Sequence, residues 1–157
     1  MTLRAFSNWL SATPLSQLLQ DTHGAIAGVQ MIHIVCLATL FALALNLSLR
    51  LAGRGLVIEP LAGMAARFIP GIWICLGVLL LTGSLLIIAE PHRTISNPAF
   101  YAKMVLLVIA IALTLGLAAL ARRQPDKTTR LRVAVAAVYM LTWIGIIIAG
   151  RFIAYLI

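Results

Sequence analysis

Four long runs of apolar residues dominate the chain, and most polar residues lie between these runs or before the first of them. Each run is long enough to cross the roughly 30 Å hydrocarbon core of a bilayer as a helix, which takes about 20 residues. The runs are apolar on all sides, which is typical of helices that contact lipid. The predicted membrane spans cover about residues 25–49, 68–89, 99–121 and 131–156.

Composition supports a membrane protein with no large extramembrane part. Hydrophobic residues make up 62% of the 157 residues and charged residues only 10%. In lipid only helices and closed barrels satisfy the backbone, and these runs lack the alternation of barrel strands. The sequence therefore predicts an all-α protein, an integral membrane four-helix bundle that forms a single transmembrane domain over residues 1–157.

The segment 3–22 precedes the first span and has apolar residues at broadly helical spacing among polar ones. Thr13 followed by Pro14 is typical of a helix start, with a capping hydroxyl and a proline in the first turn. We expect one or two short amphipathic helices that lie in the membrane interface.

The formal net charge is +8, but its distribution does not indicate a nucleic-acid-binding protein. The basic residues flank the apolar spans instead of forming a run interleaved with aromatic residues. Eight of the 12 Lys and Arg side chains fall in the first and third loops: Arg50, Arg54, Arg67, Arg122, Arg123, Lys127, Arg130 and Arg132. Positively charged loops stay in the cytoplasm, so we expect both termini to be periplasmic.

His33 is the residue most indicative of function. It lies about eight residues into the first span, roughly 12 Å below the outer end. An imidazole at that depth is paired, ligated or in contact with water, so His33 is either a structural histidine or a ligand for haem iron or copper. Gln30 lies one turn earlier on the same face. The two cysteines, Cys36 and Cys75, are better explained as small buried residues than as metal ligands.

Other polar groups gather on the predicted outer side. Lys103, at the start of the third span, either extends to the lipid headgroups or faces the bundle interior, where it would hold a carboxylate. Arg151 lies near the outer end of the fourth span. Tyr139 and Trp143, on the same span, are expected to line a pocket beside His33. His23, Glu90, His92 and Arg93 are expected at the outer surface.

Four segments together resemble a family of uncharacterised bacterial four-helix membrane proteins. The family pattern places an acid three residues before a histidine in the first span, where this chain has Gln30 and His33. The first span ends in an Asp-Leu-Arg-Leu-Leu-Gly-like segment, here residues 48–53 with Ser in place of Asp. A Thr-Gly pair, here residues 82–83, follows near the end of the second span. An Asn-Pro-x-Phe-x-x-Lys segment, here residues 97–103, begins the third span.

More distantly, a histidine early in the first span with a lysine in the third is similar to two other groups. These are the copper-resistance D-type membrane proteins and the haem-containing bacterial protoporphyrinogen oxidase. The resemblance implies a four-helix scaffold in the bacterial inner membrane, with His33 and Lys103 as site residues. Gln30 in place of the acid removes the carboxylate that would orient His33.

The sequence thus predicts a small inner-membrane protein with a haem b or copper redox site in the outer half of the bundle. His33 would be the metal ligand, with Lys103 and Arg151 neutralising propionates or a substrate carboxylate. The alternative is a non-catalytic accessory subunit that packs against other membrane subunits. A four-helix transporter or channel is a third option, but no Asp or Glu lies in the middle of a span. Whether the chain is an enzyme stays open at this point.

Overall fold

The computed structural model describes residues 3–54, 60–123 and 130–155, and all of the secondary structure in this part of the chain is helical. Three helices are short: α1 (Leu3–Ser11), α2 (Pro14–Asp21) and α5 (Pro91–Ile95). Four are long: α3 (Ala25–Leu51), α4 (Leu61–Ala89), α6 (Pro98–Arg123) and α7 (Arg130–Tyr155). The four long helices are each long and apolar enough to cross a membrane. The predicted all-α four-helix bundle is therefore confirmed.

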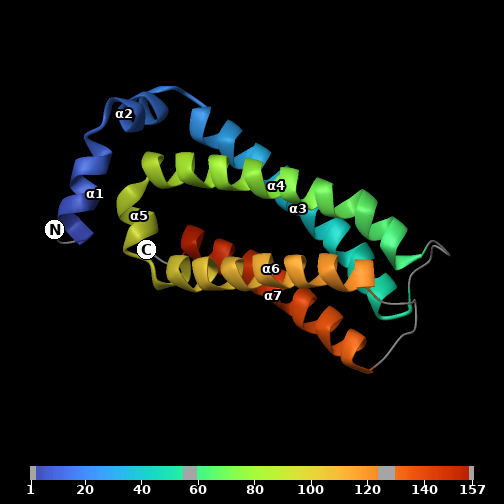
Figure 1. Cartoon of the computed structure of the whole chain (residues 1–157). Helices are drawn as coiled ribbons and strands as arrows, with labels where there is room; N and C mark the ends of the chain where they lie inside the picture. The colour runs from blue at the N-terminus through green and yellow to red at the C-terminus, as the bar shows by residue number, and fades with distance from the viewer. Residues whose placement is uncertain (1–2, 55–59, 124–129, 156–157) are drawn as a thin grey trace.

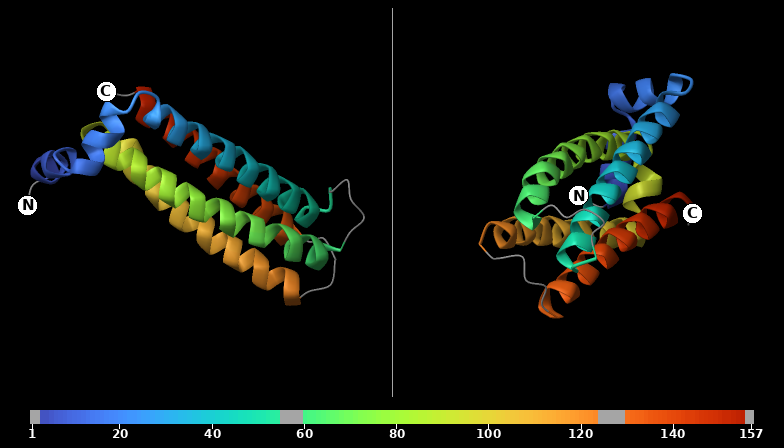
Figure 2. Two further views of the ribbon diagram at one scale, coloured as in Figure 1. Left: turned by 90° about the horizontal axis from the view of Figure 1, so that it is seen from above. Right: turned by 90° about the vertical axis from the view of Figure 1, so that its right-hand side faces the viewer.

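The bundle consists of two antiparallel pairs, α3 with α4 and α6 with α7 (Figure 1). The pairs are joined by further contacts of α3 with α7 and of α4 with α6. Figure 2 shows the four long helices running side by side, with the short helices at one end. The N-terminal ends of α3 and α6 and the C-terminal ends of α4 and α7 therefore meet at the end where α5 lies (Figure 1).

Helix α4 begins at Leu61, earlier than the apolar run that starts at Phe68. Residues 61–67 are mostly good helix formers, and Leu61, Met64 and Ala65 are buried in the core. Packing thus extends the helix beyond the span that hydropathy marks. Pro70 lies inside α4, where neighbouring helices make such a residue tolerable. The predicted end of the last span at residue 156 lies outside the described residues.

Glycines allow the paired helices to approach closely. A Cβ added to Gly71 of α4 would lie 3.1 Å from Leu43 Cδ1 of α3. A Cβ added to Gly145 of α7 would lie 3.0 Å from Leu106 Cδ1 of α6. Small residues at helix contacts are the usual basis of packing in lipid, where no hydrophobic effect drives the helices together.

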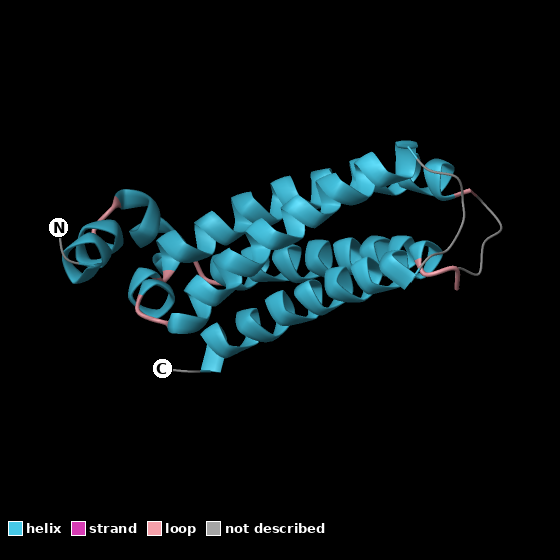
Figure 3. Ribbon diagram, turned by 60° about the horizontal axis from the view of Figure 1, so that its bottom comes forward, coloured by secondary structure: helices cyan, strands magenta, loops and turns pink. Residues whose placement is uncertain are grey.

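Helices α1 and α2 lie at the end of the bundle where α3 begins and α7 ends (Figure 3). Thr13 caps α2 by accepting a hydrogen bond from the Ser16 amide, with Pro14 in the first turn. Ser16 Oγ donates to the Ile88 carbonyl at 2.8 Å, and Gln20 Nε2 donates to the Ala89 carbonyl at 2.8 Å. These bonds satisfy carbonyls at the end of α4 that have no intrahelical partner, and they hold α2 against the bundle.

Candidate functional site

A cavity of about 390 Å³ lies between the four long helices at the end occupied by α5. Its volume falls within the roughly 300–1,000 Å³ typical of small-molecule sites. Most of its lining is apolar. The polar side chains that line it are Gln30, His33, Glu90, Arg93, Thr94, Lys103 and Arg151. Four of the residues expected from the sequence, Gln30, His33, Lys103 and Arg151, are thus brought together although they come from three helices.

The His33 ring is held by a residue of the neighbouring helix. His33 Nδ1 lies 2.8 Å from Thr82 Oγ1 of α4. The Thr82 hydroxyl donates its one proton to the Val78 carbonyl at 2.7 Å, so we assign the Nδ1 proton to His33 and the accepting role to Thr82. In this tautomer Nε2 carries the lone pair, which leaves it able to ligate a metal or accept a hydrogen bond.

Both His33 and Lys103 pack against glycines of neighbouring helices. A Cβ added to Gly83 would lie 3.5 Å from His33 Cε1, and one added to Gly150 would lie 3.6 Å from Lys103 Nζ. Larger residues at these two positions would take up space beside the imidazole and the ammonium group. The glycines therefore keep the polar side of the cavity open, and they account for the close approach of α4 and α7 to the site.

The electrostatic balance of the cavity is positive. Lys103, Arg93 and Arg151 bring three cations, and Glu90 brings one carboxylate. Glu90 Oε2 is already paired with Arg93 Nη1 at 2.9 Å. Within the described part of the chain, no carboxylate lies within salt-bridge distance of Lys103, which is half-buried. An anionic group of a ligand would supply a counter-charge for Lys103.

The structure does not place Tyr139 and Trp143 in this cavity. Both are fully buried in the core, with their rings in edge-to-face contact at a centroid distance of 6.2 Å. The Tyr139 hydroxyl lies 2.9 Å from Thr114 Oγ1 of α6. They lie on the same side of α7 as the cavity-lining residues Ile146 and Gly150, but nearer to the opposite end of the bundle.

Thr82, Gly83 and Thr94 contribute to the site although sequence reasoning did not select them as site residues. The Thr-Gly pair was visible as a motif, but its position in the sequence of α4 does not show that it faces His33 on α3. Glu90 and Arg93 were expected at the outer surface and line the cavity as well. His23 and His92 are exposed and do not line it.

The donor set of the cavity suits haem better than a copper ion. Among the described residues that line it, His33 is the only one with an imidazole or thiol, and Met104 adds a thioether. No cluster of three or more His, Cys, Asp or Glu side chains occurs in residues 3–54, 60–123 and 130–155. Copper draws most of its ligands from the protein, whereas a haem iron needs only one or two axial ligands because the porphyrin supplies the others.

Comparison with known proteins does not place the chain in a group. No protein-family model matches it, and no curated protein or solved structure does. The resemblance based on the motifs around His33 and Lys103 therefore stays a prediction. What can be argued about function comes from the cavity and its residues.

Proposed function

We propose that this protein binds haem b in the cavity and acts as a membrane-embedded redox protein, with His33 as the axial ligand. The observation that carries the proposal is the pairing of His33 Nδ1 with Thr82, which fixes the ring and leaves Nε2 as the ligating nitrogen. A ligating histidine usually donates its other N–H to a fixed acceptor in this way. A bound haem would supply an iron centre for one-electron chemistry.

The cations of the cavity have a clear role in this proposal. A haem carries two propionate groups, and these need positive partners when they lie partly out of water. Lys103 and Arg151 come from α6 and α7, on the side of the cavity formed by the second helix pair. They would hold the propionates, while the apolar lining from α3 and α4 would cover the porphyrin face.

We propose further that the protein lies in the bacterial inner membrane with both termini periplasmic, so that the cavity is at the periplasmic end. The support is the excess of Lys and Arg in the two loops at the other end. A redox partner or reactant would then reach the site from the periplasm or from the outer leaflet.

The test is an optical spectrum of the full chain purified in mild detergent, with iron and copper content measured on the same sample. We expect a Soret band with stoichiometric iron in the wild type and its loss in His33→Ala. His23→Ala and His92→Ala serve as matched controls, because both histidines are exposed outside the cavity. A colourless wild type expressed with ample haem, or equal haem content in His33→Ala, would refute the proposal.

Thr82→Val tests the orienting role separately. The variant keeps the shape of the side chain and removes the acceptor for His33 Nδ1–H, so haem retention should fall about 10- to 100-fold, as for other partners of metal-ligating histidines. Ser84→Ala is the control, because the Ser84 hydroxyl only bonds to the Leu80 carbonyl and is exposed. Equal haem retention in the two variants would show that Thr82 does not position the ligand.

A second candidate function, an accessory subunit of a larger membrane complex, is favoured by one observation. Asn46 of α3 is exposed on the outside of the bundle, and its amide donates to the Ala42 carbonyl at 2.8 Å. A carboxamide on a membrane-facing surface is better placed against another helix than against lipid. Native electrophoresis of gently solubilised membranes tests this candidate, since migration only as a small monomer or homodimer would contradict it.

A further inference from the structure

The two short helices before the first span bury serines and expose their large apolar side chains. Ser7 of α1 is 2% exposed and Ser16 of α2 is 0% exposed. By contrast, Trp9 is 58% exposed and Leu18 is 63% exposed. A helix that packs on a water-soluble protein turns its apolar side inward. The apolar sides of α1 and α2 are therefore arranged for a contact outside the bundle.

Helix α1 has three sides of different character. Phe6 and Trp9 form one side, and their rings stack at a centroid distance of 5.9 Å. The exposed polar residues Arg4 and Asn8 lie about 150° away around the helix, at about 100° per residue. The buried Ser7 lies on the third side, where α1 packs against α5 and α4.

Helix α2 has the same three sides. The exposed Leu15 and Leu18 lie about 110° around the helix from the exposed Gln17 and Asp21. Ser16 is on the buried side, where its hydroxyl donates to the end of α4. Both helices thus separate an apolar side from a polar side while a third side holds them to the bundle.

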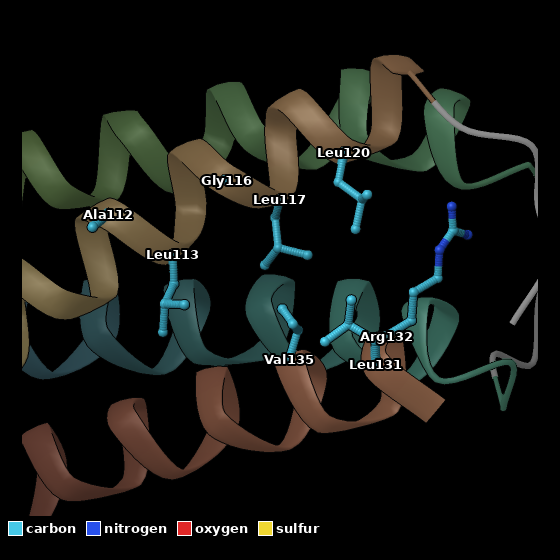
Figure 4. A pocket seen from close by; sticks show the side chains of 8 residues that line it. All are labelled: Ala112, Leu113, Gly116, Leu117, Leu120, Leu131, Arg132 and Val135. Carbon is cyan, nitrogen blue, oxygen red and sulfur yellow. The ribbon is translucent and has the colours of Figure 1, made fainter. Parts of the chain in front are cut away.

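The level of α2 along the bundle matches one surface of the membrane. On α7, Arg132 and Arg151 bracket the apolar stretch, and the helix rises about 28 Å between them, close to the roughly 30 Å thickness of the hydrocarbon core. Figure 4 shows the Arg132 guanidinium beyond Leu120, past the apolar side chains between α6 and α7. At the other end, Arg151 lines the His33 cavity together with Glu90. Since α2 bonds to the two α4 carbonyls just before Glu90, it lies where the hydrocarbon core ends.

Helices α1 and α2 also support one wall of the His33 cavity. Arg93 and Thr94 of α5 line this cavity, and α1 packs against α5 (Figure 1). Helix α2 is bonded to the end of α4, directly before α5 begins. A helix as short as α5, with only five residues, is not stable on its own. Its position therefore depends on the helices that pack against it.

We propose that α1 and α2 form a lipid-binding surface, which we call the α1–α2 anchor. Its residues Phe6, Trp9, Leu15 and Leu18 insert into the adjacent leaflet and thereby hold α5 in place as a wall of the His33 cavity. The separation of sides selects lipid as the partner, because a bilayer surface offers a helix acyl chains on one side and water on the other. This proposal does not depend on haem binding.

The first test is spin-label accessibility of the full chain in phosphatidylcholine vesicles, with the native cysteines replaced by Ala. Labels at Phe6→Cys and Leu18→Cys should collide mainly with oxygen, which concentrates in lipid. Labels at Asn8→Cys and Gln17→Cys should collide mainly with a water-soluble nickel chelate. Each pair compares two sides of one helix. Equal access of the nickel chelate to all four labels would overturn the proposal.

The same measurement detects a different partner at the α1–α2 anchor. If labels at Phe6→Cys and Leu18→Cys were shielded from both reagents, protein and not lipid would cover the apolar sides. A second copy of the chain or another membrane protein would then be the occupant, and the proposal would be wrong.

The second test is hydrogen exchange in α5, measured in the same vesicles. The Thr94 amide donates to the Glu90 carbonyl at 3.2 Å, so its exchange reports how often α5 opens. Trp9→Gln should speed this exchange about tenfold, because the transfer of one large apolar side chain into lipid contributes at least about that factor. Asn8→Gln is the matched control on the polar side of the same helix and should leave the rate unchanged.

Equal exchange rates in Trp9→Gln and Asn8→Gln would show that the lipid contact does not hold α5, and this would overturn the proposal. Leu18→Gln, with Gln17→Asn as its control, repeats the comparison on α2. A folding defect in one variant therefore does not decide the outcome.

Discussion

The hydrogen bond between Thr114 and Tyr139 gives the sharpest test of how the bundle core is held together. Both side chains are fully buried. The Thr114 hydroxyl donates to the Ala110 carbonyl at 2.7 Å, so the Tyr139 hydroxyl must donate to Thr114 Oγ1 at 2.9 Å. Removing the acceptor and removing the donor therefore have different consequences.

Thr114→Val leaves the Tyr139 hydroxyl in the core with its acceptor gone, and this should lower the free energy of unfolding by about 1–3 kcal/mol. Tyr139→Phe removes the donor itself and leaves Thr114 bonded to Ala110. Tyr139→Phe should lower the free energy of unfolding by only about 0.5–1.5 kcal/mol. We expect a value at the lower end of this range, because interhelical hydrogen bonds in membranes average about 0.6 kcal/mol. The double variant should be more stable than Thr114→Val alone, because it has no orphaned hydroxyl.

The assay is reversible unfolding in mixed detergent micelles, followed by circular dichroism. Thr39→Val is the matched control, since the Thr39 hydroxyl is exposed and bonds only to the Val35 carbonyl of its own helix. It should change the free energy of unfolding by less than about 0.5 kcal/mol. The reasoning is refuted if Thr114→Val costs no more than Thr39→Val, or if the double variant loses the full sum of the two single costs.

Three further predictions concern orientation and packing. In a chain with its native cysteines replaced by Ala, Ser96→Cys should react with an impermeant thiol reagent in intact cells and Arg54→Cys should not; the reverse pattern would invert the topology. Gln20→Leu should raise the rate at which protease cuts before α3 several-fold, because α2 loses its bond to the end of α4; an unchanged rate would contradict this. Gly145→Leu should cost about 1–3 kcal/mol through overpacking, and Gly77→Leu much less; equal unfolding midpoints would show that the α6–α7 contact is not tight.

The fold was largely predictable because lipid imposes a simple length rule on apolar runs. The number of long helices and the cap of α2 at Thr13 both agree with the sequence. The start of α4 at Leu61 was not predictable in this way. Hydropathy detects what lies in lipid, whereas residues 61–67 are helical because they pack on the core and have good helix propensity.

The site was predictable only as far as single helices determine it. His33 stood out because an imidazole deep in a span needs a partner. Spacing within one helix shows only neighbours three or four residues away, so an orienting group was sought at position 30, where Gln30 lacks a carboxylate, and Thr82 was not considered. The partner that the structure provides comes from α4, and only the pairing of α3 with α4 brings it within 2.8 Å. The hydropathy of two helices does not determine their register against each other.

The same limit explains Tyr139 and Trp143. Tyr139 and Trp143 lie one turn apart on α7, which favoured a shared pocket wall. However, Tyr139 and Trp143 lie beyond the cavity along the axis of α7. The cavity ends near Ile146, and the core on the far side of Ile146 is closed. Tyr139 uses its hydroxyl on Thr114, so its polar atom is already satisfied within the core.

This closed core also bears on which kinds of function the bundle can support. Between the cavity at His33 and the opposite end of the bundle lie Leu40, Thr114, Tyr139 and Trp143, each with 0% exposure. A pathway for water or ions across the bundle would have to pass these side chains, which argues against a channel in this conformation. Under the proposed function, a ligand in the His33 cavity would exchange electrons, protons or substrate at that one end. A redox role therefore requires a partner on that side of the membrane or in its lipid leaflet.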